Sequence, residues 1–442
     1  MSKDTISRRN FLGMTASFAG LAALSNFSAV SANAQTSDYK ALVCVFLFGG
    51  NDGHNTIVPL AGSEYAAYQT LRGSMALAPN EILPIGSNGA PYGLHHALPE
   101  LQNLYDQGKM AIVANVGNLV RPTTRADLAQ IPMQLFSHSD QVAQMQSGAP
   151  DGSMGTGWGG RISDAAQGNN AGTNFPPSIS LNGAALFSNG AQIQSASLQP
   201  GNNLSQNAMN VYPPAHAAAR AAAQTEIVNN FSGFNLVNGA NKTLADANDL
   251  SAILRNAGGG GIATPFPSTA IGNQLKEAAR LISLRAAIGV TRQVFFCGLG
   301  GFDTHGAQSY TQWDLLRQTS QALGAFYAAM QELGVADKVT AFTASDFGRT
   351  LQPSGSGTDH GWGSHHLVVG GAVRGGQIYG AFPSMQINAP HFLDQRGILV
   401  PTTALAQYGA TLAKWFGVAD SALDAVFPVL PNFTARDLGF MG

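Results

Sequence analysis

The sequence predicts an α/β protein with a doubly wound, mainly parallel sheet and helices on both of its faces. Short, continuously apolar runs alternate along the 442 residues with longer segments of helical periodicity. Unbroken apolar strands are typical of parallel sheets that are buried on both faces. Polar, glycine-rich motifs follow several of these runs, and doubly wound sheets bind ligands at the carboxyl ends of their strands. We therefore expect one polar site at that edge of the sheet.

In chain order, the predicted elements are a strand at 41–48, a helix at 99–107, strands at 110–116 and 293–299, a helix at 311–333 and a strand at 339–343. The first helix carries Leu101 and Leu104 on one face and ends at Gly108. The second ends before Gly334, since glycine suits the left-handed residue that follows a helix. This alternation of strands and helices is what predicts a parallel sheet.

The segment between these elements has a different composition. Residues 165–219 contain no Asp, Glu, Lys or Arg and are rich in Asn, Gly, Ser, Ala and Gln. We interpret 165–270 as an inserted, loop-rich subdomain that covers or flanks the site. A partly disordered excursion is the alternative.

The composition excludes two classes of protein. The chain has 23 Lys and Arg against 25 Asp and Glu, so its net charge is −2. A nucleic-acid partner requires a surplus of basic residues, which is missing here. Charged residues make up 11% of the chain, against roughly 25% in an ordinary soluble domain. The second class is a polytopic membrane protein. Beyond the N-terminus, no apolar run approaches the ~18 residues that a membrane-spanning helix needs.

Residues 1–34 have the pattern of a twin-arginine export signal. Its parts are the pair Arg8-Arg9, the following Phe11-Leu12, an apolar stretch to Val30, and Ala32-Asn33-Ala34 before the cleavage point. The alternative is a chance arginine pair in an ordinary leader. Export through the Tat translocase would deliver a folded protein, comprising residues 35–442, to the periplasm or the outside, with no transmembrane anchor after cleavage.

The two cysteines, Cys44 and Cys297, each lie within a predicted buried strand. We interpret both as buried apolar side chains. A disulfide between them stays open, because an oxidising compartment would permit it and sequence spacing cannot establish it.

Histidines and aspartates gather in glycine-rich turns. The clusters are Asp52 with His54, Ser137 with His138, Asp303 with His305, and Asp359 and His360 with His365 and His366. Carboxylates and imidazoles are the ligands that Zn²⁺ and Mn²⁺ favour when thiolates are absent. A local hydrogen-bonded turn explains any single His–Asp pair, but four clusters favour one shared polar site.

Several of these motifs together resemble a known family. They are the strand-GGNDGHN segment at 43–55, GFDTHG at 301–306, ASDFGRT at 344–350, GTDHGWGSHH at 357–366 and GGAVRGGQIYG at 370–380. The chain resembles the exported bacterial family called domain of unknown function 1501, which is placed in the alkaline phosphatase and sulfatase superfamily. The resemblance covers nearly the whole of residues 35–442.

The resemblance implies one or two divalent ions, Zn²⁺ or Mn²⁺, at the carboxyl edge of the sheet. Carried over by position, the implied metal ligands are Asp52, Asp303, His305 and Asp346, with Asp359, His360 and His365 as further candidates. The chain departs from the superfamily pattern at Phe347, where a histidine is expected after Asp346.

The superfamily also places a nucleophile at the start of a helix. Ser137 is our candidate, Ser139 is the substitute and His138 is a catalytic neighbour, while Arg349 would clamp the anionic group. The alternative for either serine is an N-cap. A formylglycine sulfatase is disfavoured, because the Cys/Ser-x-Pro-x-Arg pattern is absent.

Two functions follow as hypotheses. The first is an exported metal-dependent hydrolase or transferase that acts on a phosphate or other anionic ester, either small or carbohydrate-linked. The second is a non-catalytic periplasmic binding or cell-envelope protein that keeps the phosphatase-like fold. The neutral insert and Phe347 favour the second, and the convergence of Asp and His clusters favours the first.

Overall fold

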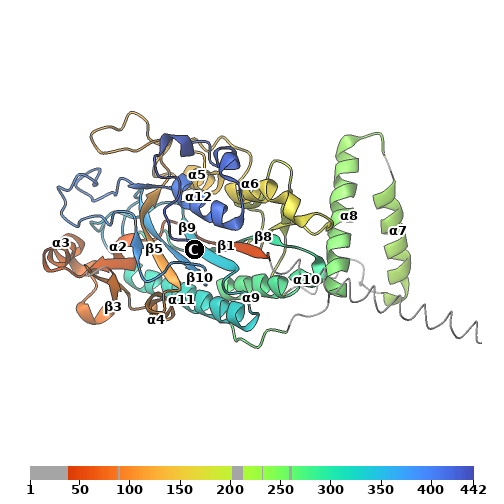
Figure 1. Cartoon of the computed structure of the whole chain (residues 1–442), viewed down its shortest axis with the longest axis horizontal. Coiled ribbons are helices and arrows are strands. Elements are labelled where there is room, and N and C mark those ends of the chain that lie inside the picture. Colours follow the sequence, from red (N-terminus) through yellow and green to blue (C-terminus); the bar gives the residue numbers. More distant parts are fainter. Residues whose placement is uncertain (1–37, 88–89, 202–212, 231, 258–260) are drawn as a thin grey trace, which may run out of the picture.

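A computed structural model describes residues 38–87, 90–201, 213–230, 232–257 and 261–442 (Figure 1). The twin-arginine signal predicted at 1–34 lies outside the described residues. None of the helices in the described part is long and apolar enough to cross a membrane.

The centre of the molecule is a nine-stranded sheet in the order β11-β5-β10-β9-β1-β8-β6-β7, with β12 paired to β5. The strands are β1 (Lys40–Leu47), β5 (Met110–Gly117), β6 (Ser178–Ser180), β7 (Ala196–Ser197), β8 (Arg292–Leu299), β9 (Val339–Ser345), β10 (Ser364–Gly370), β11 (Ile378–Tyr379) and β12 (Thr403–Ala404). Strand β1 is parallel to both of its neighbours, β8 and β9, and β10 alone runs antiparallel to its neighbours. The predicted mainly parallel sheet is confirmed.

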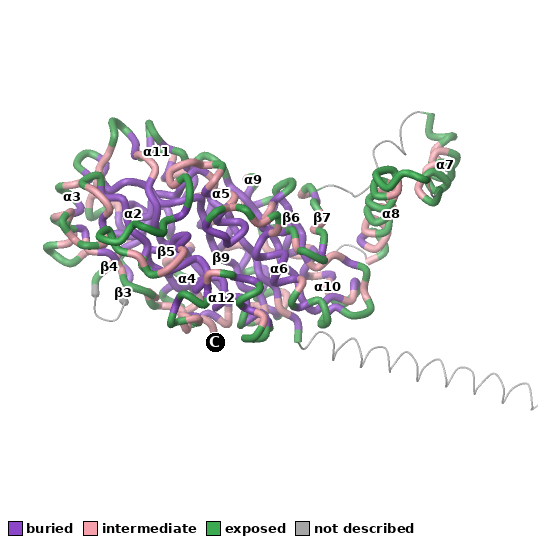
Figure 2. Tube along the Cα trace, turned by 90° about the horizontal axis from the view of Figure 1, so that it is seen from above, coloured by how far each residue is buried: buried purple, intermediate pink, exposed green. Residues whose placement is uncertain are grey.

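Helices cover both faces of this sheet (Figure 1). One layer contains α4 (Pro99–Asp106), α9 (Ala270–Ser283) and α11 (Gln308–Glu332), and the other α5 (His138–Ser147), α6 (Trp158–Ala165) and α12 (Leu405–Phe416). Side chains alternate across a strand, so Val43 and Val45 join the core of the first layer while Cys44 and Phe46 join that of the second. Two hydrophobic cores therefore sandwich the sheet, and Figure 2 shows its interior buried.

The remaining elements flank this sandwich. They are α2 (Gly53–Thr56), β2 (Ile57–Pro59), α3 (Gly62–Arg72), β3 (Ile82–Ser87), β4 (Ala90–His95), α7 (Ala217–Asn229), α8 (Asn235–Asn256), α10 (Arg285–Ile288) and α13 (Leu423–Val426). Strands β2, β4 and β3 form a small antiparallel sheet beside the central one.

The segment at 165–270, predicted as a loop-rich insert, contains regular elements between its loops. Strands β6 and β7 extend the central sheet, since Ile179 of β6 packs into the core. Helices α7 and α8 then project from the body as a pair (Figures 1 and 2). Alanine and other good helix formers explain the helices, although few of these residues are charged.

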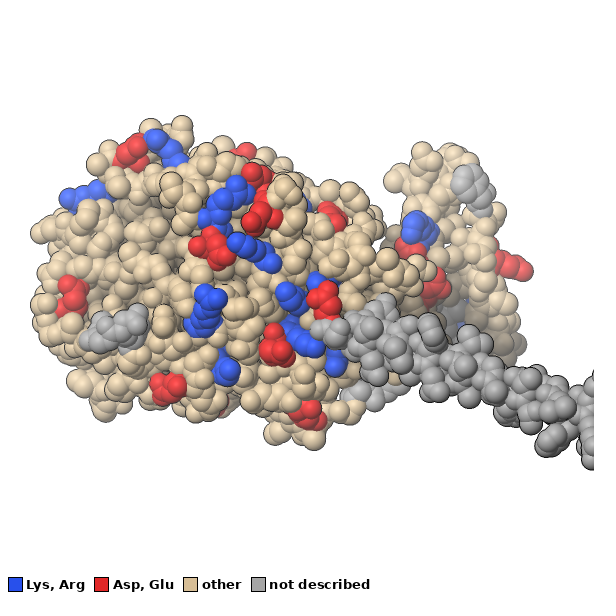
Figure 3. Space-filling model, in the orientation of Figure 1, with Lys and Arg blue, Asp and Glu red and all other residues tan. Residues whose placement is uncertain are grey.

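Cys44 and Cys297 lie on the neighbouring strands β1 and β8, and both are buried and unbonded. Burial raises the pKa of each thiol above its ordinary value. The interpretation of both as buried apolar side chains is confirmed. On the face in Figure 3, the few acidic and basic side chains lie intermixed.

Candidate metal centre

The loops after three adjacent strands meet at the carboxyl edge of the central sheet. Asp303 follows β8 and Asp346 follows β9, and β1 lies between these strands. Gly49, just after β1, has φ of +112°, and a Cβ there would lie 2.3 Å from the backbone nitrogen of Asp303. Glycine at this position therefore allows the loops after β1 and β8 to touch.

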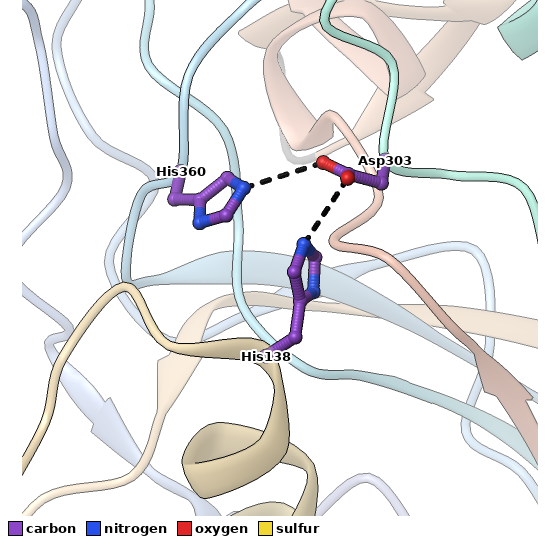
Figure 4. A group of neighbouring side chains, drawn as sticks. All are labelled: His138, Asp303 and His360. Atoms are coloured by element: carbon purple, nitrogen blue, oxygen red, sulfur yellow. Dashed lines mark hydrogen bonds and ion pairs between the residues drawn. The ribbon is translucent and has the colours of Figure 1, made fainter.

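Three side chains converge in this region (Figure 4). His138 Nε2 lies 3.3 Å from Asp303 Oδ2, and His360 Nε2 lies 3.3 Å from Asp303 Oδ1. The three residues each offer a ligand atom, and these atoms lie within 4.8 Å of one another. We call His138, Asp303 and His360 the central triad.

His305 and Asp359 lie at the solvent side of the triad. His305 Nε2 is 2.9 Å from Asp303 Oδ1 and also 2.9 Å from His360 Nε2, while its Nδ1 is 3.4 Å from Asp359 Oδ1. Asp303 and Asp359 each expose 42% of the side chain, so solutes can reach this side of the cluster.

Each triad residue has a partner that fixes its orientation. Asp346 Oδ2 accepts hydrogen bonds from His138 Nδ1 at 2.9 Å and from the backbone nitrogen of Gly49 at 3.0 Å. His360 Nδ1 donates to the carbonyl of Phe136 at 2.6 Å, so its Nε2 carries the lone pair that faces Asp303. Phe136 has φ of +77°, which is unusual for a residue with a side chain.

Arg349 orients Asp303, the carboxylate of the triad. Its Nη1 donates to Asp303 Oδ1 at 2.9 Å and to the carbonyl of Gly49 at 3.2 Å, and its Nε and Nη2 donate to Thr358. The Arg349 side chain is completely buried. The structure thus orients this guanidinium toward protein groups, and its role as a clamp for an anionic ester stays a prediction.

The electrostatics favour the charged form of the Asp303 carboxylate and the neutral form of the His360 imidazole. Burial alone would raise the pKa of Asp303, but the hydrogen bond from Arg349 and the charges of His138 and His305 outweigh it and lower that pKa. The pKa of His138 is raised, chiefly by its hydrogen bond to Asp346. The pKa of His360 is lowered, first by burial and then by the nearby charges of His138 and Arg349.

Asp52 and His365, both predicted ligands, lie apart from the triad. The buried Asp52 carboxylate pairs with Arg72, accepts from Gln308 and caps α2 by accepting from the backbone nitrogen of His54 at 3.0 Å. Burial opposes its ionisation, but Arg72 lowers its pKa. His365 Nδ1 accepts from the backbone nitrogen of Asn115 at 3.0 Å, and burial lowers its pKa to about 3.

The predicted nucleophile, Ser137, is the N-cap residue of α5, and its hydroxyl donates to Asp140. Ser139, the substitute, lies 3.2 Å from Ser137, Oγ to Oγ, and is more exposed. The Ser137 side chain makes no capping hydrogen bond to the backbone of α5. The residue that α5 brings into the triad is His138, which we had predicted as a catalytic neighbour.

Sequence reasoning did not find the roles of Phe136 and Phe347. The Phe136 contribution is a backbone carbonyl, for which a sequence carries no signal. The Phe347 ring packs against His360 at 4.6 Å and His138 at 4.8 Å between centroids, so it is an apolar wall of the triad at the place where a histidine was expected.

The fold and the cluster define an α/β protein with a candidate Asp/His metal centre at the carboxyl edge of its sheet. The chain belongs to the family described as Protein of unknown function (DUF1501), whose model matches residues 39–392. No curated protein matches it.

Several solved structures are distantly similar. A sulfatase from Pseudoalteromonas sp. has a TM-score of 0.36 and 10% identity, over 90% of this chain and 72% of that one. The C-terminal periplasmic domain of EcEptC from Escherichia coli has a TM-score of 0.35 and 11% identity, over 90% of this chain and 87% of that one. The phosphonate monoester hydrolase of Agrobacterium radiobacter has a TM-score of 0.30 and 9% identity, over 85% of this chain and 74% of that one. Likeness at this level carries no information about the reaction of this chain.

Proposed function

We propose that the protein is a metal-dependent hydrolase or transferase of a phosphate or other anionic ester, and that it works after export through the twin-arginine pathway. The observation that carries the proposal is the central triad, in which one carboxylate and two imidazoles converge from the start of α5 and from two loops. The substrate would be a small or carbohydrate-linked ester in the periplasm or outside the cell.

The donor set fits a divalent ion such as Zn²⁺ or Mn²⁺. Ligand atoms within 4.8 Å of one another need only small side-chain shifts to reach the ~2.0–2.2 Å ligand distances of Zn²⁺. His138 Nε2 and the buried Asp346 Oδ1 have no hydrogen-bond partner among the described residues. Asp346 and the Phe136 carbonyl orient the two imidazoles as outer partners of metal-binding histidines do.

Asp303, His138 and His360 would hold the first ion, with His305 as a further ligand. Asp346 Oδ1 and Asp359 are the carboxylate atoms left for a second. Asp52 and His365 are not carried into this ligand set, because Arg72, Gln308 and Asn115 already engage them. A bound ion would polarise the ester and stabilise the negative charge that develops on it.

Ser137 remains our candidate for the attacking group. Its hydroxyl already donates to Asp140, and that carboxylate can accept the proton when the oxygen attacks the ester. Arg349 would act indirectly, by holding Asp303 in its charged form.

An ester panel tests the proposal. The protein with added Zn²⁺ or Mn²⁺ is assayed on aryl phosphate mono- and diesters and aryl sulfates, alongside Asp303→Asn, Ser137→Ala and the control Asp394→Asn, whose carboxylate pairs with Arg396. We expect turnover of at least one ester that falls at least about a hundredfold in Asp303→Asn and persists in the control. No turnover of any ester, or turnover untouched by Asp303→Asn, would sink the proposal.

The non-catalytic alternative is favoured by one observation: the Ser137 hydroxyl and the Arg349 guanidinium are both occupied by protein groups. On that alternative the triad holds a structural ion and the chain binds an envelope component without turning it over. Metal that binds tightly to a protein with no esterase activity would favour this second function.

A further inference from the structure

Strand β7 is an edge of the central sheet among the described strands. It pairs with β6 alone, in parallel register, with Ile179 opposite Ala196 and Ser180 opposite Ser197. The backbone nitrogen of Leu198 donates to the carbonyl of Ser180 at 2.9 Å. Because backbone groups alternate in direction along a strand, the N–H and C=O of Ser197 point away from β6 toward the open edge.

A large groove lies against this edge. It has a volume of about 1760 Å³ and is lined by residues 192–199 around β7, by the segment 167–177 and by the α8 residues 235–251. Pockets for small molecules occupy roughly 300–1,000 Å³, so the groove is large enough for a polymer. In Figure 2, the exposed β7 faces the projecting α8.

The groove walls carry few charges. Gln192, Gln194 and Asn174 are exposed amides that can both donate and accept hydrogen bonds. The α8 wall adds Lys242 and Asp246, which pair with each other at 2.6 Å, and the single further acidic residue Asp249.

Apolar side chains lie between these polar groups. Ile193, Leu198 and Leu250 line the same groove. A strand with apolar and polar side chains in alternation would meet both kinds of wall.

We propose that this groove binds an extended, uncharged peptide segment, which adds as a strand to the edge of β7 that pairs with none of the described strands, and lies between β7 and α8. A groove between an edge strand and a helix suits strand addition, in which backbone hydrogen bonds give affinity and pockets for alternate side chains give specificity. The outward backbone groups of Ser197 distinguish this occupant from a saccharide, which needs no strand geometry. The site is separate from the metal centre.

Selection of peptides on the whole protein tests the proposal. A phage-displayed library of random heptapeptides is selected against the wild-type chain, and the winning sequence is synthesised and its Kd measured by fluorescence anisotropy. Ser197→Pro removes the outward N–H and blocks the edge, whereas the matched control Ser197→Ala keeps the backbone intact. We expect Ser197→Pro to weaken binding by about tenfold or more, and Ser197→Ala to change it by less than about twofold.

A second measurement leaves the protein unchanged. N-methylation of alternate peptide residues removes the donors of a pairing strand, so methylation in one of the two alternate registers should weaken binding as Ser197→Pro does. Selection of no peptide, or binding that neither Ser197→Pro nor methylation weakens, would overturn the proposal. Binding of the neutral hexasaccharide chitohexaose that survives Ser197→Pro, in place of peptide binding, would do the same.

Discussion

Arg349 is the residue on which the charge state of the centre depends most. Its guanidinium connects Asp303, the Gly49 carbonyl and Thr358, which come from three different loops. The hydrogen bond to Asp303 keeps this carboxylate ionised, and an ionised carboxylate is the form that binds a cation. A buried arginine can therefore support metal binding without touching the metal or the substrate.

Replacement of Arg349 by Met should weaken metal binding by about 10–100-fold, because outer partners of metal ligands have effects of that size. Competition between the protein and a chromophoric chelator for Zn²⁺ measures it. The part-buried Arg317→Met, which removes a pair with Asp314, is the control and should leave the affinity unchanged. Equal affinity in Arg349→Met and wild type would contradict this role.

Asp346 should control the protonation of His138. Because the hydrogen bond to Asp346 is the largest cause of the raised His138 pKa, Asp346→Asn should lower that pKa. NMR titration of the histidines in chelator-treated protein measures the shift. Asp359→Asn is the matched control, since Asp359 contacts His305 instead; an unchanged His138 pKa in Asp346→Asn would rule this coupling out.

The sequence could predict that aspartates and histidines form the centre, because Asp303, His305 and His360 all stand in glycine-rich turns. It could not predict which carboxylates are already occupied. Asp52 is paired by Arg72, twenty positions along the chain, and His365 is engaged by a backbone nitrogen on β5. Such hydrogen bonds and ion pairs form between residues that are distant in the sequence. A local motif therefore cannot show which of its side chains already have a partner.

At the scale of elements, the loop after β1 sets how closely the strand ends can approach. Gly49 and Gly50 both have positive φ, and a Cβ on Gly50 would lie 2.3 Å from the Phe347 ring. The glycines of the GGND motif are therefore needed for packing between the loops after β1, β8 and β9.

Gly49→Ala should destabilise the protein by about 2–5 kcal/mol, since it adds both a strained backbone and a clash with Asp303. Gly108→Ala is the matched control: Gly108 also has positive φ, at +68°, but nothing lies within 4 Å of its Cβ position. We expect the control to cost about 1–2 kcal/mol. Urea unfolding compares the two variants, and equal costs would show that the close approach to Asp303 is unimportant.

Sequence patterns predicted β1, β5, β8, β9 and α11 well, because continuous apolar runs and a helical stripe are local signals. The helix predicted at 311–333 spans Gln308–Glu332, and the strand predicted at 41–48 spans Lys40–Leu47. The composition of residues 165–219 gives no local signal for the short strands that this segment contains. Two short strands there join the sheet through Ile179, whose burial depends on the rest of the core.

For the whole molecule, four buried histidines link stability to pH. Burial lowers the pKa of His54 and His366 to about 4 and that of His365 to about 3, and burial with the neighbouring His96 lowers that of His95 to about 3. Below the ordinary histidine pKa of 6.5, these four histidines bind protons in the unfolded chain. In the folded chain they stay neutral until the pH falls to about 4 or below.

The free energy of unfolding should therefore fall as pH drops from 6.5 to about 4, by up to ~1.4 kcal/mol per pH unit for each histidine. Urea unfolding in the presence of a chelator, at several pH values between 8 and 4, measures the decline. His366→Gln should reduce the slope, because it removes one of the four groups. A free energy of unfolding that stays constant over this range would contradict the predicted burial of neutral histidines.

The most direct test of the whole interpretation is the metal content of the purified protein, measured by elemental analysis after equilibration with Zn²⁺ or Mn²⁺ and removal of the excess by gel filtration. If the central triad is a metal centre, at least one equivalent should remain bound to the wild type and to Asp394→Asn. Most of it should be lost from the double variant Asp303→Asn/His360→Ala. A wild type that retains no divalent metal, or a double variant that retains as much as the wild type, would contradict a metal centre at His138, Asp303 and His360.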